Sequence, residues 1–182
     1  LFDCVLFFTS SDWDKDMHTD ENHYAKRFAK IFPVYFFQHK YKLNKQKVSI
    51  KDSSFKNIRI CDICINELRD NPDNVFSFLK ELGYFKPIIW VNDHINYLKA
   101  IRYFPFSYVI YHSNENYLIN SGKKNCISDI SDTLRSLLSE RIFDHIVVSS
   151  PAIKNSLLLN SSYRNSDITF ASNMSEIVKI SE

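Results

Sequence analysis

The side chains best suited to chemistry stand in polar stretches that follow short apolar runs. His112 comes directly after one such run, and Ser113, Glu115 and Asn116 follow it. Histidine is the side chain most easily poised for proton transfer near neutral pH. The groups after it can hydrogen-bond the hydroxyls of a sugar. The stretch therefore indicates a substrate site with His112 as the catalytic candidate. The alternative is a polar loop in which His112 caps the next turn.

A second polar stretch follows the first apolar run and contains Ser11, Asp12 and Trp13. Asp12 and Asp14 have the spacing of a calcium loop, but Met17 stands where that loop needs its glycine. We therefore expect no metal here. The stretch is better interpreted as a loop that borders a ligand site, with Trp13 as a lid or stacking surface. The alternative is that Trp13 packs on the first helix.

Two further motifs bear on cofactors. The sequence has two glycines, so it contains no glycine-rich phosphate-binding loop, and we expect no bound cofactor. Cys61 and Cys64 have the spacing of a redox pair, but they lie in an alternating segment typical of a strand. Buried, reduced cysteines are the favoured interpretation, and a redox protein is the alternative.

Composition bounds the kind of protein. The chain has 182 residues, 45% of them hydrophobic and 24% charged, with a net charge of +2. These values are typical of one globular domain and argue against a strongly basic nucleic-acid binder. No apolar run is long enough to span a bilayer and no signal peptide opens the chain, so a cytoplasmic location is expected.

Positive charge is concentrated in one segment. Its lysines are Lys40, Lys42, Lys45 and Lys47. Such a segment can bind anionic lipid headgroups, which would place the protein peripherally at the inner face of a membrane. The alternative is a solvated surface hairpin.

Apolar runs alternate with segments of helical periodicity along the whole chain. Expected strands cover residues 3–8, 34–37, 58–65, 87–91, 107–111, 145–149 and 167–170, and expected helices cover 20–31, 71–82, 94–103, 129–141 and 151–160. This order predicts an α/β fold: a doubly wound, mostly parallel sheet with helices on both faces, as in Rossmann-like domains. Ligands bind at the carboxyl ends of such strands, which adds Asn92 and Ser149 to the candidate site.

Four segments carry a resemblance to a known family. They are residues 5–14, 86–91, 108–115 and 140–151. Together they resemble the N-terminal, acceptor-binding domain of a GT-B glycosyltransferase, of the group that includes bacterial cell-surface polysaccharide and lipid enzymes. The most specific is the last, in which an acidic residue precedes the strand that ends at Ser149.

The resemblance implies transfer of a sugar from a nucleotide sugar to a glycan or lipid-linked acceptor. His112 then matches a residue that often lines the catalytic centre of the family. The family's donor pocket belongs to a second domain, so residues 1–182 are expected to form one Rossmann-like domain, the N-terminal half of an enzyme and inactive alone. A non-catalytic, flavodoxin-like binding or regulatory module is the alternative.

Overall fold

The computed structural model describes residues 1–15, 19–40, 48–118 and 126–171. They belong to two compact units, which are described separately. The first unit comprises Leu1–Trp90 and Ala100–Tyr108, and the second comprises Val91–Lys99 and Val109–Glu182.

The first unit is built on five strands. In chain order they are β1 (Val5–Phe8), β2 (Val34–His39), β3 (Ser49–Asp52), β4 (Ile58–Ile63) and β5 (Ile88–Val91), of which Val91 counts with the second unit. Their order across the sheet is β3-β4-β2-β1-β5. β1 pairs parallel with β2, and β2 with β4, whereas β3 runs antiparallel to β4. The mostly parallel arrangement places the carboxyl ends of β1, β2 and β4 at one edge.

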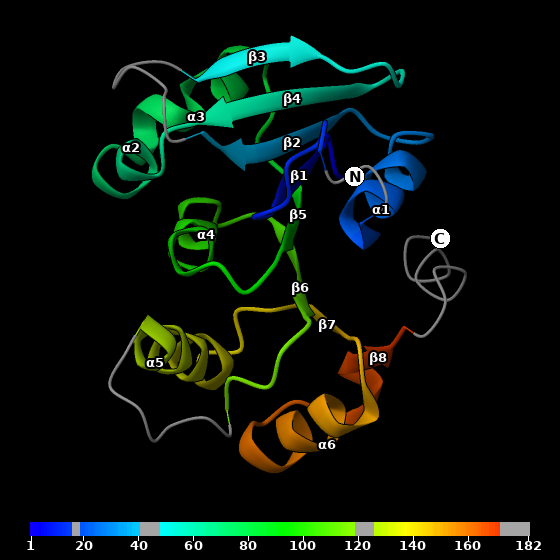
Figure 1. Cartoon of the computed structure of the whole chain (residues 1–182), viewed down its shortest axis with the longest axis vertical. Coiled ribbons are helices and arrows are strands. Elements are labelled where there is room, and N and C mark those ends of the chain that lie inside the picture. The colour runs from blue at the N-terminus through cyan, green and yellow to red at the C-terminus, as the bar shows by residue number, and fades with distance from the viewer. Residues whose placement is uncertain (16–18, 41–47, 119–125, 172–182) are drawn as a thin grey trace. The chain divides into compact units, whose positions relative to one another are not determined.

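Aromatic side chains fix helices on both faces of this sheet. Successive side chains of a strand point to opposite faces, so Phe7 and Phe8 pack on different helices. Phe7 lies 5.9 Å, centroid to centroid, from Phe28 of α1 (Asp20–Phe28). Phe8 lies 5.8 Å from Phe76 of α3 (Pro72–Glu81), which follows the short α2 (Ile65–Asp70). Figure 1 shows α1 and α3 on opposite sides of the strands.

The second unit has three parallel strands flanked by helices. The strands are β6 (Tyr108–Ser113), β7 (His145–Val148) and β8 (Ile168–Phe170), and Tyr108 itself counts with the first unit. The helices are α4 (Ile95–Ala100), α5 (Cys126–Ser139) and α6 (Pro151–Asn160). Two 3-10 turns, Ile101–Tyr103 of the first unit and Asn165–Asp167 of the second, complete the described elements.

Local signals explain where two helices begin and end. The Ser150 hydroxyl accepts a hydrogen bond from the Ile153 N–H at 3.3 Å, and Pro151 takes the first helical position of α6. Helix α3 ends just before Gly83, which has a φ of 78°, the left-handed conformation that favours glycine.

The predicted fold class is confirmed: the chain has a mixed α/β fold with a mostly parallel sheet, as in Rossmann-like domains. Two elements were missed, the edge strand β3 and the six-residue helix α2. All four residues of β3 are exposed, so its sequence lacks the apolar face that marks a half-buried strand. The interpretation of residues 1–182 as one domain of a longer enzyme stays a prediction.

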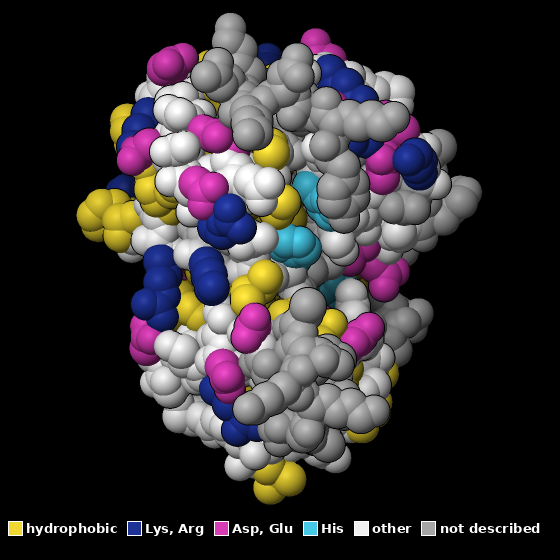
Figure 2. All heavy atoms as spheres, turned by 60° about the vertical axis from the view of Figure 1, so that its left-hand side comes forward, with side chains coloured by type: hydrophobic (Ala, Val, Ile, Leu, Met, Phe, Trp, Pro, Cys, Tyr) yellow, Lys and Arg dark blue, Asp and Glu magenta, His cyan; other side chains and the backbone are white. Residues whose placement is uncertain are grey.

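The predicted membrane contact involves residues that the structure describes only in part. No helix among them is long and apolar enough to cross a membrane. Of the basic segment, Lys42, Lys45 and Lys47 lie outside the described residues, and Lys40 forms an ion pair with Asp12. On the face shown in Figure 2, Lys and Arg side chains lie among Asp and Glu side chains.

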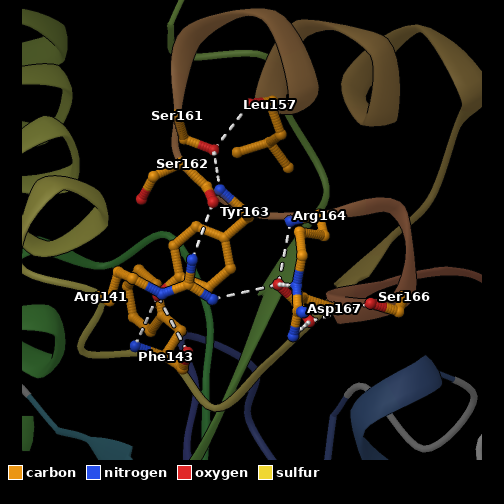
Figure 3. Close-up of polar contacts among 9 residues, drawn as sticks. All are labelled: Arg141, Phe143, Leu157, Ser161, Ser162, Tyr163, Arg164, Ser166 and Asp167. Carbon is orange, nitrogen blue, oxygen red and sulfur yellow. Dashed lines mark hydrogen bonds and ion pairs between the residues drawn. The ribbon is translucent and has the colours of Figure 1, made fainter.

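A polar network in the second unit joins the segment before β7 to the segment before β8 (Figure 3). Arg141 donates to the Ser162 carbonyl at 2.8 Å and to the Asp167 carboxylate at 3.1 Å. The Tyr163 hydroxyl lies 2.9 Å from both the N–H and the carbonyl oxygen of Phe143. These contacts hold together the two connections that set the positions of parallel strands β7 and β8.

The pKa of Asp167 is lowered to about 2, because its carboxylate accepts hydrogen bonds from the backbone N–H of Arg164 and from the side chains of Arg164, Ser166 and Arg141. A lowered carboxyl pKa stabilises the folded state above the unfolded value, about 4, and this contribution is lost as pH falls toward 2.

We predict that Asp167→Asn is less stable than wild type above pH 4, and that the difference in unfolding free energy shrinks between pH 4 and pH 2. Denaturant titrations at several pH values measure it. Asp132→Asn removes the same charge from an exposed position of α5 and is the matched control. A difference in unfolding free energy that is constant with pH would show that the folded state does not lower the pKa of Asp167.

Candidate functional site

The most unusual carboxyl group of the second unit is that of Asp93, which follows β5 and precedes α4. Its Oδ1 accepts a hydrogen bond from the Tyr111 hydroxyl of β6, and its Oδ2 accepts one from the Asn114 N–H at 3.2 Å. The Tyr111 ring is buried and stacks on Phe143 with centroids 4.8 Å apart. Asp93 is therefore held from two directions by donors that come from one strand and the loop after it.

Burial and hydrogen bonding act on Asp93 in opposite directions. Burial disfavours the charged carboxylate and raises the pKa, while the hydrogen bonds from Tyr111, Asn114 and the Glu115 backbone lower it. Burial dominates, with a further rise from the Glu115 charge, and the pKa of Asp93 reaches about 7. A carboxyl group at this pKa can accept or release a proton near neutral pH, as general acid–base groups do.

Asp93 also affects the tyrosines around it. Burial and the negative charge of Asp93 raise the pKa of Tyr111 and of Tyr117. Both phenols therefore stay protonated at neutral pH and can donate hydrogen bonds. Three of the four lone-pair positions of the Asp93 carboxylate are used by Tyr111, Asn114 and the Glu115 backbone, which leaves one position for the hydroxyl group of a ligand.

Polar groups of the neighbouring loops are fixed around this carboxyl group. The Ser113 hydroxyl accepts from Tyr111 at 3.3 Å and donates to the Glu115 carbonyl at 3.1 Å. The Ser149 hydroxyl, after β7, donates to the Asn114 carbonyl at 3.3 Å. Because β6 and β7 run parallel with Ser113 opposite Val148, their carboxyl ends lie at the same edge. The structure thus brings Ser113, Glu115 and Ser149, three predicted site residues, into one loop cluster.

The other predicted residues of the second unit are Asn92, Asn116 and His112. Asn92 is buried and precedes Asp93, and Asn116 is half-buried in the loop after β6. His112 is 2% exposed. It stands between Tyr111 and Ser113 in β6, whose hydroxyls lie 3.3 Å apart, so its side chain projects from the opposite face of the strand. The catalytic role of His112 stays a prediction.

The predicted residues Ser11, Asp12 and Trp13 belong to the first unit. Trp13 is 6% exposed and packs edge-on against Phe36 at 5.0 Å. The backbone N–H of Trp13 donates to the Gln38 side-chain oxygen at 2.6 Å. Trp13 is thus part of the packed interior of the first unit, which is the alternative to the predicted lid.

Ion pairs and a hydrogen bond attach the rest of this loop to neighbouring elements of the first unit. Asp12 pairs with Lys40, and Asp14 with Lys51 at 2.9 Å. The Ser11 hydroxyl donates to Glu21 of α1 at 3.4 Å. The aspartates that have the spacing of a calcium loop are thus engaged by lysines, and within the described ranges no cluster of three or more His, Cys, Asp or Glu side chains is arranged to hold a metal ion.

Cys61 and Cys64 are free thiols. Cys61 is buried in β4, and burial raises the pKa of its thiol. A redox pair needs a lowered thiol pKa, so the environment of Cys61 favours the buried-cysteine interpretation over redox chemistry.

Sequence reasoning missed Asp93 and Tyr111. Asp93 follows the apolar run 88–91 by two positions, which is the place where α/β sheets present ligand-binding groups. The same signal predicts its neighbour Asn92 as a site residue. Tyr111 lies in a predicted strand, and nothing in the sequence indicates that its hydroxyl points toward Asp93.

No protein-family model matches this sequence, and no curated protein matches it either. Solved structures do. Sucrose-phosphate synthase from Thermosynechococcus elongatus is similar with a TM-score of 0.65 and 14% identity, covering 93% of this chain and 47% of that chain. The E. coli trehalose-6-phosphate structure bound with UDP-2-fluoro glucose is similar with a TM-score of 0.58 and 10% identity, covering 97% and 50%.

A third similar structure is the UDP-forming alpha,alpha-trehalose-phosphate synthase from Burkholderia vietnamiensis, with a TM-score of 0.53 and 9% identity, covering 85% of this chain and 42% of that chain. The chain thus spans about half the length of these three proteins. At such low identities the likeness establishes a shared fold, and the site must be judged on its own groups.

The raised pKa of Asp93 predicts a specific pH dependence of stability. The folded state binds a proton at Asp93 more tightly than the unfolded state does, so this group destabilises the fold as pH rises from about 4 to about 7.

We predict that the stability of Asp93→Asn falls less than that of wild type over this pH interval. The unfolding temperature of the variant, measured relative to that of wild type, should therefore increase as pH rises. Thermal unfolding at about pH 4.5 and about pH 8, near the two ends of the titration, measures the change. The same substitution at Asp132 should leave the wild-type pH profile intact. If the unfolding temperatures of Asp93→Asn and wild type changed equally with pH, the folded state would leave the pKa of Asp93 near its ordinary value.

Proposed function

We propose that this chain binds the acceptor of a glycosyltransferase reaction, in which a sugar passes from a nucleotide sugar to a glycan or a lipid-linked acceptor. The observation that carries the proposal is the Asp93 cluster: a carboxyl group with a pKa of about 7, held by Tyr111 and Asn114, at the carboxyl ends of the strands. The proposal is supported by the fold, which the chain shares with synthases that are named for sugar phosphates.

The chemistry of the cluster fits a sugar hydroxyl. Transfer requires a hydroxyl oxygen of the acceptor to attack the anomeric carbon of the donor, whose bond to the nucleoside diphosphate breaks as the new bond forms. The nucleoside diphosphate leaves with the electron pair of the broken bond, and the attacking oxygen loses its proton. Asp93, when deprotonated, can accept a hydrogen bond from this hydroxyl and take up its proton, because its pKa lies near neutral pH. Ser113, Glu115, Asn116 and Ser149 are proposed to bind other hydroxyl groups of the acceptor.

The proposal gives the remaining predicted residues secondary roles. Asn92 precedes Asp93 and is proposed to orient the acceptor. His112 is also proposed to have a catalytic role, exerted from the face of β6 opposite to that of the Tyr111 hydroxyl. For Ser11, Asp12 and Trp13 of the first unit, substrate contact stays a prediction, and Trp13 is packed against Phe36. The nucleotide sugar is the proposed donor, bound mainly by a second domain, and UDP-glucose is the donor to test first, since one similar structure holds UDP-2-fluoro glucose and another is UDP-forming.

We predict that the product of the whole gene releases UDP from UDP-glucose when an acceptor saccharide is present, and that Asp93→Asn lowers kcat/KM at least about tenfold, the loss expected for a hydrogen bond to a charged group. The wild-type profile of kcat/KM should rise with pH through about 7, the pKa of Asp93, and Asp93→Asn should lack that limb.

A coupled UDP-release assay over a panel of mono- and disaccharides measures both effects. His112→Ala tests the second proposed role in the same assay, and Asp132→Asn is the control for charge and folding. Wild-type turnover in Asp93→Asn would contradict the proposal. Saccharide binding by the wild type without any UDP release would instead favour a non-catalytic binding module.

A further inference from the structure

A cavity of about 360 Å³ lies within the first unit, at the amino ends of β2 and β4. Its lining includes Tyr35, Asp52, Phe55, Lys56, Arg59 and Tyr84. The residues that line the cavity belong to the first unit, whereas the Asp93 cluster is part of the second. The volume of the cavity falls in the range of small-molecule sites, roughly 300–1,000 Å³.

The floor of the cavity consists of two tyrosines. Tyr35 is 2% exposed, and its ring meets that of Tyr84 edge-on, with centroids 5.7 Å apart. The Tyr35 hydroxyl is hydrogen-bonded to the side chains of Tyr84 and Arg59, and burial together with the contact to Tyr84 raises its pKa. The floor therefore combines apolar ring surface with hydroxyl groups, as binding sites for ring-shaped ligands do.

Arg59 is oriented at the rim of the cavity. Besides its contact with Tyr35, its Nε lies 3.5 Å from Asp52 Oδ1, and the Arg59 side chain remains 50% exposed. Asp52 is 88% exposed, so this ion pair is weak and leaves guanidinium donors for a ligand. A planar guanidinium held by two neighbours is well suited to bind the oxygens of a phosphate group.

Lys56 provides a second cation from the turn between β3 and β4. The next residue, Asn57, has φ of 65° and its side chain donates to the Ala29 carbonyl at 3.0 Å, which anchors the turn to the segment after α1. The residues that line the cavity thus include two cationic side chains and one carboxylate, that of Asp52. Phe55, 42% exposed, adds a ring at the mouth.

We propose that this cavity binds a phosphate monoester with a ring-sized body, its phosphate contacting Arg59 and Lys56 and its ring packing against Tyr84 and Phe55. Asp52 and Ser53 accept hydrogen bonds from hydroxyl groups of the ring, which a sugar and a ribose both offer. The site is separate from the proposed catalytic cluster, so its occupant is a regulatory ligand or a second substrate rather than the acceptor at Asp93.

Isothermal titration of the chain with glucose 6-phosphate and with AMP tests this proposal and separates the two sources of phosphate monoester. Glucose, adenosine and inorganic phosphate are the matched probes that lack either the phosphate or the ring. We expect one of the two esters to bind, with inorganic phosphate at least about tenfold weaker and the uncharged probes weaker still.

Arg59→Met and Lys56→Met should each weaken binding at least about tenfold, since each removes a charge-assisted contact while keeping an apolar stem. Arg69→Met removes an exposed arginine of α2, outside the cavity, and should bind like wild type. Unfolding temperatures check that each variant is folded, and the exposed Lys56 is the safer of the two positions. Binding of neither ester, or equal weakening by Arg69→Met, would overturn the proposal.

Discussion

The conflict between burial and hydrogen bonding at Asp93 is the constraint on which the candidate site depends. Taking a carboxylate out of water is costly unless donors surround it, and Tyr111 and the Asn114 N–H supply two. Those donors do not fully offset burial, so the group keeps a proton up to about pH 7. A carboxyl group that gains or loses its proton near neutral pH, and can still accept a hydrogen bond, can act as a general acid or base. The surrounding strands and loops hold Asp93 in this environment.

The architecture of the second unit explains how such a group is held. Asp93 lies on the loop that enters α4, whereas its donors lie on β6 and the loop that follows. Tyr111 is immobilised by stacking on Phe143, and the Phe143 backbone is in turn held by the Tyr163 hydroxyl. The network around Asp167 fixes the connection that contains Tyr163. The position of one hydroxyl group in the site is therefore supported by packing that extends to β8.

Much of the fold could be predicted because it depends on hydrophobic periodicity. The apolar runs at 5–8, 34–37 and 88–91 are buried throughout and become adjacent strands of the first unit. The edge strand β3 could not be predicted in this way, since its exposed residues carry no apolar pattern and only pairing with β4 makes it a strand. The left-handed residue Gly83 was predictable, because its conformation is a local property of the chain.

The site was less predictable, since it depends on contacts between distant residues. Polar loops after strands indicated the second-unit cluster, and Ser113, Glu115 and Ser149 do share it. The pKa of Asp93, however, results from burial, which is opposed by hydrogen bonds from the Tyr111 hydroxyl and from a backbone N–H twenty-one positions away in sequence. Trp13 shows the opposite error, because a tryptophan in a polar loop suggests an exposed surface, whereas Phe36 and Gln38 bury it.

The most direct test of the central claim is an NMR titration of the Asp93 side-chain carboxyl carbon in the folded chain. We expect a midpoint near pH 7, which moves when an acceptor saccharide is added, because hydrogen bonding from a hydroxyl group changes the balance between burial and solvation. A midpoint near the ordinary aspartate value of about 3.9, unchanged by saccharides, would contradict it.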